Sequence, residues 1–302
     1  DSGAVTVAGG VLALGAHDET VGVVTLSSGS ITGSSGILTG SSYSITNSTG
    51  TTSISAILAG TGSLTKSGGG TLTLSGANTY SGGTTISAGT LALTSDGTLG
   101  GSPSSLSIGN GAILDIKRTL DLVLTTLSMT GSASITNSTS AASSLTINGA
   151  SDLSGSIRTK NNQTYSGIVT LNGNTTLTST AGNITFDSQI RSSSDKNYSL
   201  TISASLGTVT LNEAVGGNFS GSTLTSAARP DELSITASLI NLNADVWTGA
   251  SQIYNGPVLI GGINAGTSGF LYSHYQDVTP SLPVAANPVL YQNSSVYART
   301  LI

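Results

Sequence analysis

The feature that most limits the folds open to this chain is an alternation of polar and apolar side chains in short segments. It is clear at Thr71–Leu74, Thr84–Ile86 and Thr90–Leu93. A two-residue period is typical of a strand with one buried face, and Thr, Val and Ile suit a pleated surface. Clusters of Gly, Asn and Ser separate the segments about every eight to twelve residues. No stretch has a clear helical period, so we predict an all-β chain, with two strands around Lys117-Arg118.

Short motifs recur along the chain. The segment Ile45–Thr49 recurs as Ile135–Thr139, and Asn78–Gly82 recurs as Gln163–Gly167. A weaker copy of the second motif lies at Gln252–Gly256. Each copy of the second motif is followed by an apolar segment of strand type, which indicates a repeat architecture.

Many short strands, glycine turns and internal repeats are typical of a solenoid, in which each coil stacks on the last at about 4.8 Å. Aromatic residues make up only 4% of the chain, which suits a core of small aliphatic side chains. A pair of β-sandwiches is the alternative, but it normally has larger core residues. We therefore predict a right-handed parallel β-helix, or β-solenoid, over residues 1–269, with roughly twenty residues per coil.

One segment resembles a known repeat. Residues 57–93 contain Gly60–Lys66, Gly70–Leu74, Asn78–Gly82 and Ala88–Leu91, and together these closely resemble the passenger-associated β-strand repeat of bacterial autotransporters. Residues 163–217 look like the looser repeats of filamentous-haemagglutinin-like surface proteins.

The resemblance implies a secreted right-handed β-helix on the surface of a Gram-negative bacterium. It implies a scaffold and no catalysis. The start at Asp1 leads us to expect an exported chain, either a mature product or a fragment. The repeat residues that we expect to build the scaffold are Gly60, Gly62, Gly70, Leu72, Leu74, Asn78, Tyr80, Gly82 and Gly89.

The last part of the chain, residues 270–302, differs in composition. It holds three of the six prolines and several aromatic residues. Prolines interrupt a regular coil, and aromatic side chains supply contact area at interfaces. We predict an irregular C-terminal extension that is either an arm docking on another subunit or a cap over the last coil; its final residues, 296–302, alternate like a strand that could add to an exposed edge in cis or in trans. The candidate interaction residues are Phe270, Tyr272, Tyr275, Tyr291, Tyr297 and Ile302.

Residues that could carry chemistry are sparse. His17-Asp18-Glu19 could form a weak metal or acid/base cluster, but a polar turn between two strands is favoured. His274 lies near serines and an aspartate, without the elbow motif of a nucleophilic serine. Sugar-cleaving β-helix enzymes need paired carboxylates or a calcium site, whereas here the acids, such as Asp115 and Asp121, are scattered. We therefore predict no catalytic residue, no cofactor and no metal. Trp247 is expected to fill a widened coil, with ligand stacking as the alternative.

Composition excludes further classes. Nine Lys and Arg against fourteen Asp and Glu leave no excess positive charge for nucleic acid. No Cys is present, so disulfides and Cys-based zinc sites are excluded. No uninterrupted apolar run reaches the roughly 18 residues of a membrane-spanning helix.

These observations predict a non-enzymatic extracellular structural or adhesive protein. The expected partner is the chain itself, because a solenoid with open ends can join head to tail into a fibre or layer. A monomeric adhesin that binds surface glycans or other cells is the alternative. A carbohydrate-active enzyme is the third hypothesis.

Overall fold

The computed structural model describes residues 3–193, 198–216, 219–220, 223–224, 228–260, 271–273 and 278–279. The chain divides into two compact units, Asp1–Ser143 and Ser144–Ile302. The described residues contain no α-helix, and their strands pair in parallel with the single exception of a short hairpin. The prediction of an all-β parallel β-solenoid is confirmed.

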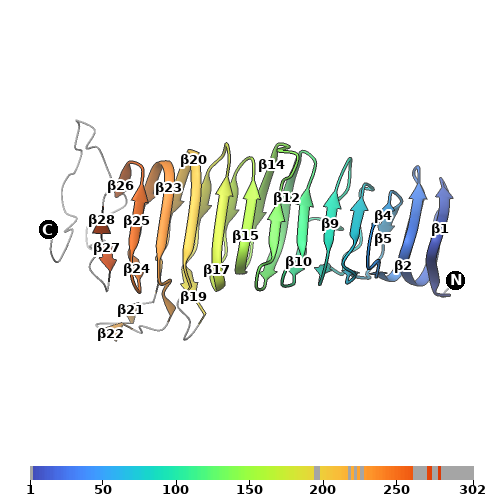
Figure 1. Cartoon of the computed structure of the whole chain (residues 1–302), viewed down its shortest axis with the longest axis horizontal. Coiled ribbons are helices and arrows are strands. Elements are labelled where there is room, and N and C mark those ends of the chain that lie inside the picture. The colour runs from blue at the N-terminus through green and yellow to red at the C-terminus, as the bar shows by residue number, and fades with distance from the viewer. Residues whose placement is uncertain are drawn as a thin grey trace. The chain divides into compact units, whose positions relative to one another are not determined.

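In the first unit, equivalent strands of successive coils lie side by side, so each pairs with a strand about twenty residues further along the chain (Figure 1). Leu38 lies opposite Leu58, and Leu72 lies opposite Leu91. The strands are β1 (Val5–Gly15), β2 (Glu19–Gly33), β3 (Ile37–Ile45), β4 (Thr51–Ile54), β5 (Ile57–Ala59), β6 (Leu64–Lys66), β7 (Thr71–Leu74), β8 (Thr84–Ile86), β9 (Thr90–Leu93), β10 (Ser104–Ile108), β11 (Ile113–Ile116), β12 (Leu120–Met129) and β13 (Ser134–Thr136).

The core of the first unit consists of columns of inward side chains, one from each coil. The alternation of the sequence creates them, because side chains two residues apart on a strand share a face, and in-register pairing stacks like positions. One column contains Val7, Leu26, Ile45, Lys66, Ile86, Ile108 and Met129. Six of these seven side chains are apolar, and the exception is Lys66.

The second unit has the same construction with coils of more unequal length. Leu145 pairs with Gln163, but Leu211 pairs with Leu242 much further along the chain. Its strands are β14 (Ser143–Ile147, which begins at the boundary), β15 (Ser151–Thr159), β16 (Gln163–Tyr165), β17 (Val169–Ser179), β18 (Ile184–Phe186), β19 (Ile190–Ser192), β20 (Leu200–Leu211), β21 (Phe219–Ser220), β22 (Thr223–Leu224), β23 (Leu233–Leu242), β24 (Val246–Thr248), β25 (Gln252–Asn255), β26 (Val258–Ile260), β27 (Leu271–Ser273) and β28 (Val278–Thr279).

Several local predictions can be compared with these strands. Lys117 and Arg118 do separate two strands, β11 and β12, as predicted. The repeated motif differs between its copies, because Gln163–Tyr165 and Gln252–Tyr254 lie on strands whereas Asn78–Tyr80 does not. The predicted boundary at residue 270 lies outside the described residues and stays a prediction. No helix within the described residues has the length and hydropathy needed to cross a membrane.

Candidate interaction surfaces

One candidate surface lies at β1, the first strand of the first unit. Among the described strands, β1 pairs only with β2. A cavity of about 300 Å³ opens beside it. The cavity is lined mainly by apolar side chains of β1, β2 and β3, with two ionisable groups among them: Val5, Leu12, Ala13, Leu14, His17, Glu19, Val21 and Leu38.

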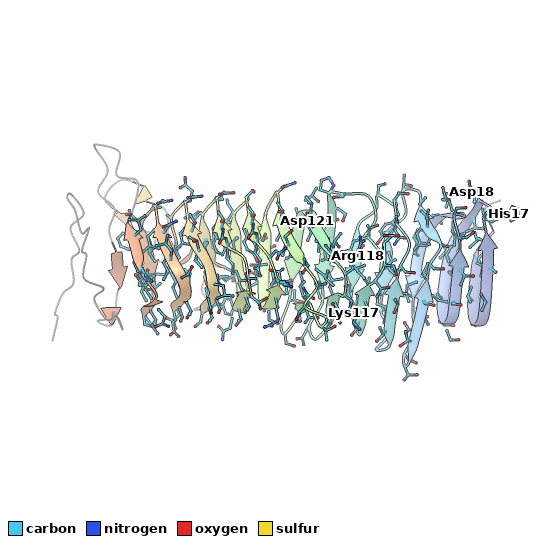
Figure 2. The ribbon with its side chains drawn as sticks, turned by 90° about the horizontal axis from the view of Figure 1, so that it is seen from above. His17, Asp18, Lys117, Arg118 and Asp121 are labelled. Atoms are coloured by element: carbon cyan, nitrogen blue, oxygen red, sulfur yellow. The ribbon has the colours of Figure 1, made fainter. Side chains whose placement is uncertain are left out.

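The two ionisable lining residues belong to His17-Asp18-Glu19, which joins β1 to β2. Figure 2 shows His17 and Asp18 close together, apart from Lys117, Arg118 and Asp121. All three side chains of the turn are exposed, and Asp18 Oδ1 accepts a hydrogen bond from the backbone N–H of Ile37 at 2.9 Å. The favoured interpretation as a polar turn is confirmed. No group of three or more potential metal ligands occurs in the described part of the chain.

A second surface is a column of hydroxyl side chains on the outside of the first unit, which we name the hydroxyl ladder. It lies between two inward columns, so each member alternates with buried side chains on its own strand. Nearly all of its members are half-buried, and none is charged. The ladder contains Thr6, Thr25, Ser44, Thr65, Thr85, Ser107 and Ser128.

The motif around Asn78 joins three successive coils through one buried side chain. Asn78 Oδ1 accepts a hydrogen bond from Leu58 N at 2.9 Å, and its Nδ2 donates to Thr98 O at 2.9 Å. Asn78 lies in a turn outside the strands. Its side-chain amide therefore forms hydrogen bonds to backbone groups that strand pairing does not satisfy at this position.

Tyr80 is fully buried two residues later. Its hydroxyl is 2.7 Å from the Thr84 hydroxyl, and its ring packs 5.9 Å from that of Tyr43. Burial raises the pKa of Tyr80. The corresponding tyrosines of the second unit, Tyr165 and Tyr254, instead donate to a glutamine two residues earlier.

The predicted scaffold glycines lie where one coil touches the next. A Cβ on Gly82 would lie 2.5 Å from the carbonyl carbon of Gly62, and one on Gly62 would lie 2.5 Å from Ser41 O. Gly89 has a φ of +70°, and a Cβ there would lie 2.4 Å from Gly70 O. The remaining scaffold residues are the fully buried Leu72 and Leu74 of β7 and Gly60, which also has a positive φ.

Comparison with protein-family models matches residues 64–93 to the passenger-associated-transport-repeat family. This segment is therefore similar to a passenger-associated-transport repeat. The resemblance to autotransporter passenger repeats is thereby confirmed, and with the β-solenoid fold it supports a surface passenger-like protein. Gly60 and Gly62 precede the matched residues. Comparisons with curated proteins and with solved structures give no match.

The matched residues 64–93 contain a buried cation that was not among the predicted site residues. Lys66 is fully buried between Ile45 and Ile86. Its Nζ donates to Gly68 O, and also to Ala88 O at 3.4 Å. Burial lowers the pKa of Lys66. The alternation Leu64-Thr65-Lys66 already assigns Lys66 to the same face as Leu64, so this signal was available.

Outside the repeat, the carboxylates that were considered for catalysis differ in their surroundings. Asp115 is buried and accepts hydrogen bonds from the backbone N–H and hydroxyl of Ser138 at 3.0 and 2.7 Å. Its carboxylate also lies 3.6 Å from Lys117 Nζ. Asp121 is exposed. The burial of Asp115 is therefore explained by its structural role, because its carboxylate fixes the turn that contains Ser138.

The predicted interaction residues at the C-terminus have no described side chains. Tyr272 lies on β27, which pairs with β24, and the others lie outside the described residues: Phe270, Tyr275, Tyr291, Tyr297 and Ile302. His274 lies outside them as well. Trp247 on β24 is buried, with 6% of its surface exposed, which agrees with a packing role.

Proposed function

We propose that this chain is a non-enzymatic structural protein of a bacterial surface, and that copies of it associate end to end. The observations that support the proposal are the passenger-associated-transport match within a β-solenoid and a mainly apolar cavity of about 300 Å³ beside β1. An apolar surface of this kind can be covered by contact with another chain. Contacts between unlike ends do not close, so they generate a filament.

The low charge of the chain and its family match also support association of copies at a bacterial surface. The chain has only 8% charged residues, so little electrostatic repulsion opposes contact between copies. The passenger-associated-transport repeat supports a surface location, and we propose the outer surface of a Gram-negative bacterium.

The test is light scattering and electron microscopy of the 302-residue chain over a range of concentrations. We expect species that grow with concentration. Val5→Asp should suppress them, because it places a charge in the cavity wall. Val23→Asp is the matched control, since Val23 is 42% exposed on the second coil and does not line the cavity. A chain that stays monomeric at every concentration would refute the proposal.

A second candidate function is glycan binding by the hydroxyl ladder, because neutral hydroxyl groups in a regular column can hydrogen-bond to sugars. The buried aromatic rings of Tyr43, Tyr80, Tyr165 and Tyr254 are not available as stacking platforms. A glycan array tests this function. Binding should fall in Thr65→Val and Thr85→Val, and an array without hits would exclude it.

A further inference from the structure

The hydroxyl ladder of the first unit is the middle one of three columns of outward side chains. Side chains two residues apart on a strand share a face, and the residues two positions before and after the ladder members are mostly serine or threonine as well. From β2 to β12 only Val23, Gly83 and Gly109 interrupt the two flanking columns. One flanking column contains Ser27, Thr46, Ser67, Ser87 and Thr130, and the other contains Ser42, Ser63, Ser105 and Thr126. We name the three columns together the hydroxyl lattice.

Strand pairing fixes the spacing of the hydroxyl lattice. Thr65 lies opposite Ser44 on one side and Thr85 on the other, so successive rows are about 4.8 Å apart. Along each strand, residues two positions apart are separated by about 6.6 Å. The hydroxyl groups therefore repeat regularly in two dimensions. A surface that is ordered in advance pays little entropy when it binds.

Most hydroxyl groups of the lattice have no partner within the chain. In the part of the chain that the structure describes, Ser27 donates to Val7 O at 3.4 Å and Ser67 donates to Ile45 O at 3.5 Å. The other side chains of the lattice form no hydrogen bond to described residues. The lattice can therefore form hydrogen bonds to a ligand.

A polar column of the second unit shows the contrast. Asn243 Nδ2 donates to Asn212 Oδ1 at 2.8 Å, and Asn212 Nδ2 donates to Asp187 Oδ1 at 2.9 Å. The side chains of that column are thus bonded to one another.

The lattice carries no charge. Its three columns expose hydroxyl, methyl and methylene groups together with the few interrupting residues. Another outward column of the first unit does not share these properties, because the column that contains Thr73 continues through Ala92 to Asp115, and both of these residues are buried. A neutral and regular surface suits a ligand that is itself neutral and regular.

We infer that the hydroxyl lattice binds ice. Ice presents hydrogen-bond donors and acceptors at a regular spacing in two dimensions, and the distance between equivalent oxygen atoms on its surface is close to the row spacing of the lattice. Each hydroxyl exchanges a bond to liquid water for a bond to a water molecule of the ice, so one contact contributes little. Affinity arises because many contacts form together. This function goes beyond the proposed end-to-end association and does not rest on it.

The test is the thermal hysteresis of the 302-residue chain, which is the gap between its melting and freezing temperatures, together with inhibition of ice recrystallisation. The test variant is the double substitution Thr65→Leu and Thr85→Leu, which removes two adjacent hydroxyl groups and makes the lattice uneven. The matched control is Thr71→Leu and Thr73→Leu, because these threonines are also half-buried and outward but lie on β7, outside the lattice. Thermal unfolding verifies that both double variants fold.

We expect thermal hysteresis in the wild type and in the control, and loss of most of it in the lattice variant. A wild type without hysteresis, or equal hysteresis in the two double variants, overturns the inference. Glycan binding that depends on Thr65 and Thr85, without an effect on ice, assigns the lattice to a sugar and overturns it as well. End-to-end association is measured separately by light scattering, so it stands or falls independently of these outcomes.

Discussion

Lys66 is charged, whereas the other members of its core column are apolar. The neighbours above and below it in the stack are Ile45 and Ile86, and burial lowers its pKa. Between that lowered pKa and the ordinary value of 10.5, the unfolded chain binds more protons than the folded chain, so stability rises with pH in this interval. Lys66→Met removes this dependence.

We therefore expect the wild type to gain stability relative to Lys66→Met as the pH is raised from 7 towards 10. The measurement is denaturant unfolding of both proteins at several pH values. The tyrosines are common to both proteins, so their ionisation cancels in the difference. If the difference in unfolding free energy between the two proteins does not change with pH, the pKa of Lys66 is not lowered by folding.

Gly89 is a residue whose side chain is excluded by both backbone conformation and space. Its φ is +70°, and a Cβ would lie 2.4 Å from Gly70 O. Gly89→Ala should destabilise the first unit by at least about 2 kcal/mol. Gly101→Ala is the matched control, since the nearest atom to its Cβ is 3.6 Å away. Thermal unfolding measures both, and equal losses would contradict this explanation.

At the scale of the element, the turn that contains Asn78 depends on hydrogen bonds between coils. Asn78→Ala leaves Leu58 N and Thr98 O without their partner, and each buried unsatisfied group costs roughly 1–3 kcal/mol. We expect a loss of about 2–4 kcal/mol in denaturant unfolding. Asn110→Ala is the control, because Asn110 is exposed and water can replace its bonds to Ser132. A comparable loss in the control would refute the argument.

The strands could be predicted from the sequence because alternation encodes which side chains face inward. Leu72 and Leu74 are buried on one strand as their spacing indicates. The roles of the repeated motif could not be predicted, because the partner of a side chain in a turn lies a whole coil away. Thus the side chain of Asn78 bonds to backbone groups of the two neighbouring coils. The side chain of Gln163 instead accepts from Tyr165 on its own strand and donates to Thr159 and to Thr178 O, although the two motifs are alike in sequence.

At the scale of the whole molecule, the stacking of coils determines which side chains are accessible to a partner. The sequence pointed to the C-terminal residues as the place of interaction, and those remain a prediction. It did not point to the surface beside β1, because the pairing between coils determines which residues meet there. The cavity beside β1 likewise combines residues from three strands.

The buried tyrosines of both units give the last prediction. Burial raises the pKa values of Tyr80, Tyr165 and Tyr254. Their contribution to stability is complete below the ordinary value of 10.0, and it is lost as the pH rises through the raised values, because the unfolded chain ionises first. In an absorbance titration, we expect these tyrosines to ionise only as the chain unfolds at alkaline pH. Ionisation of every tyrosine near pH 10, with the circular dichroism of the strands intact, would contradict their burial.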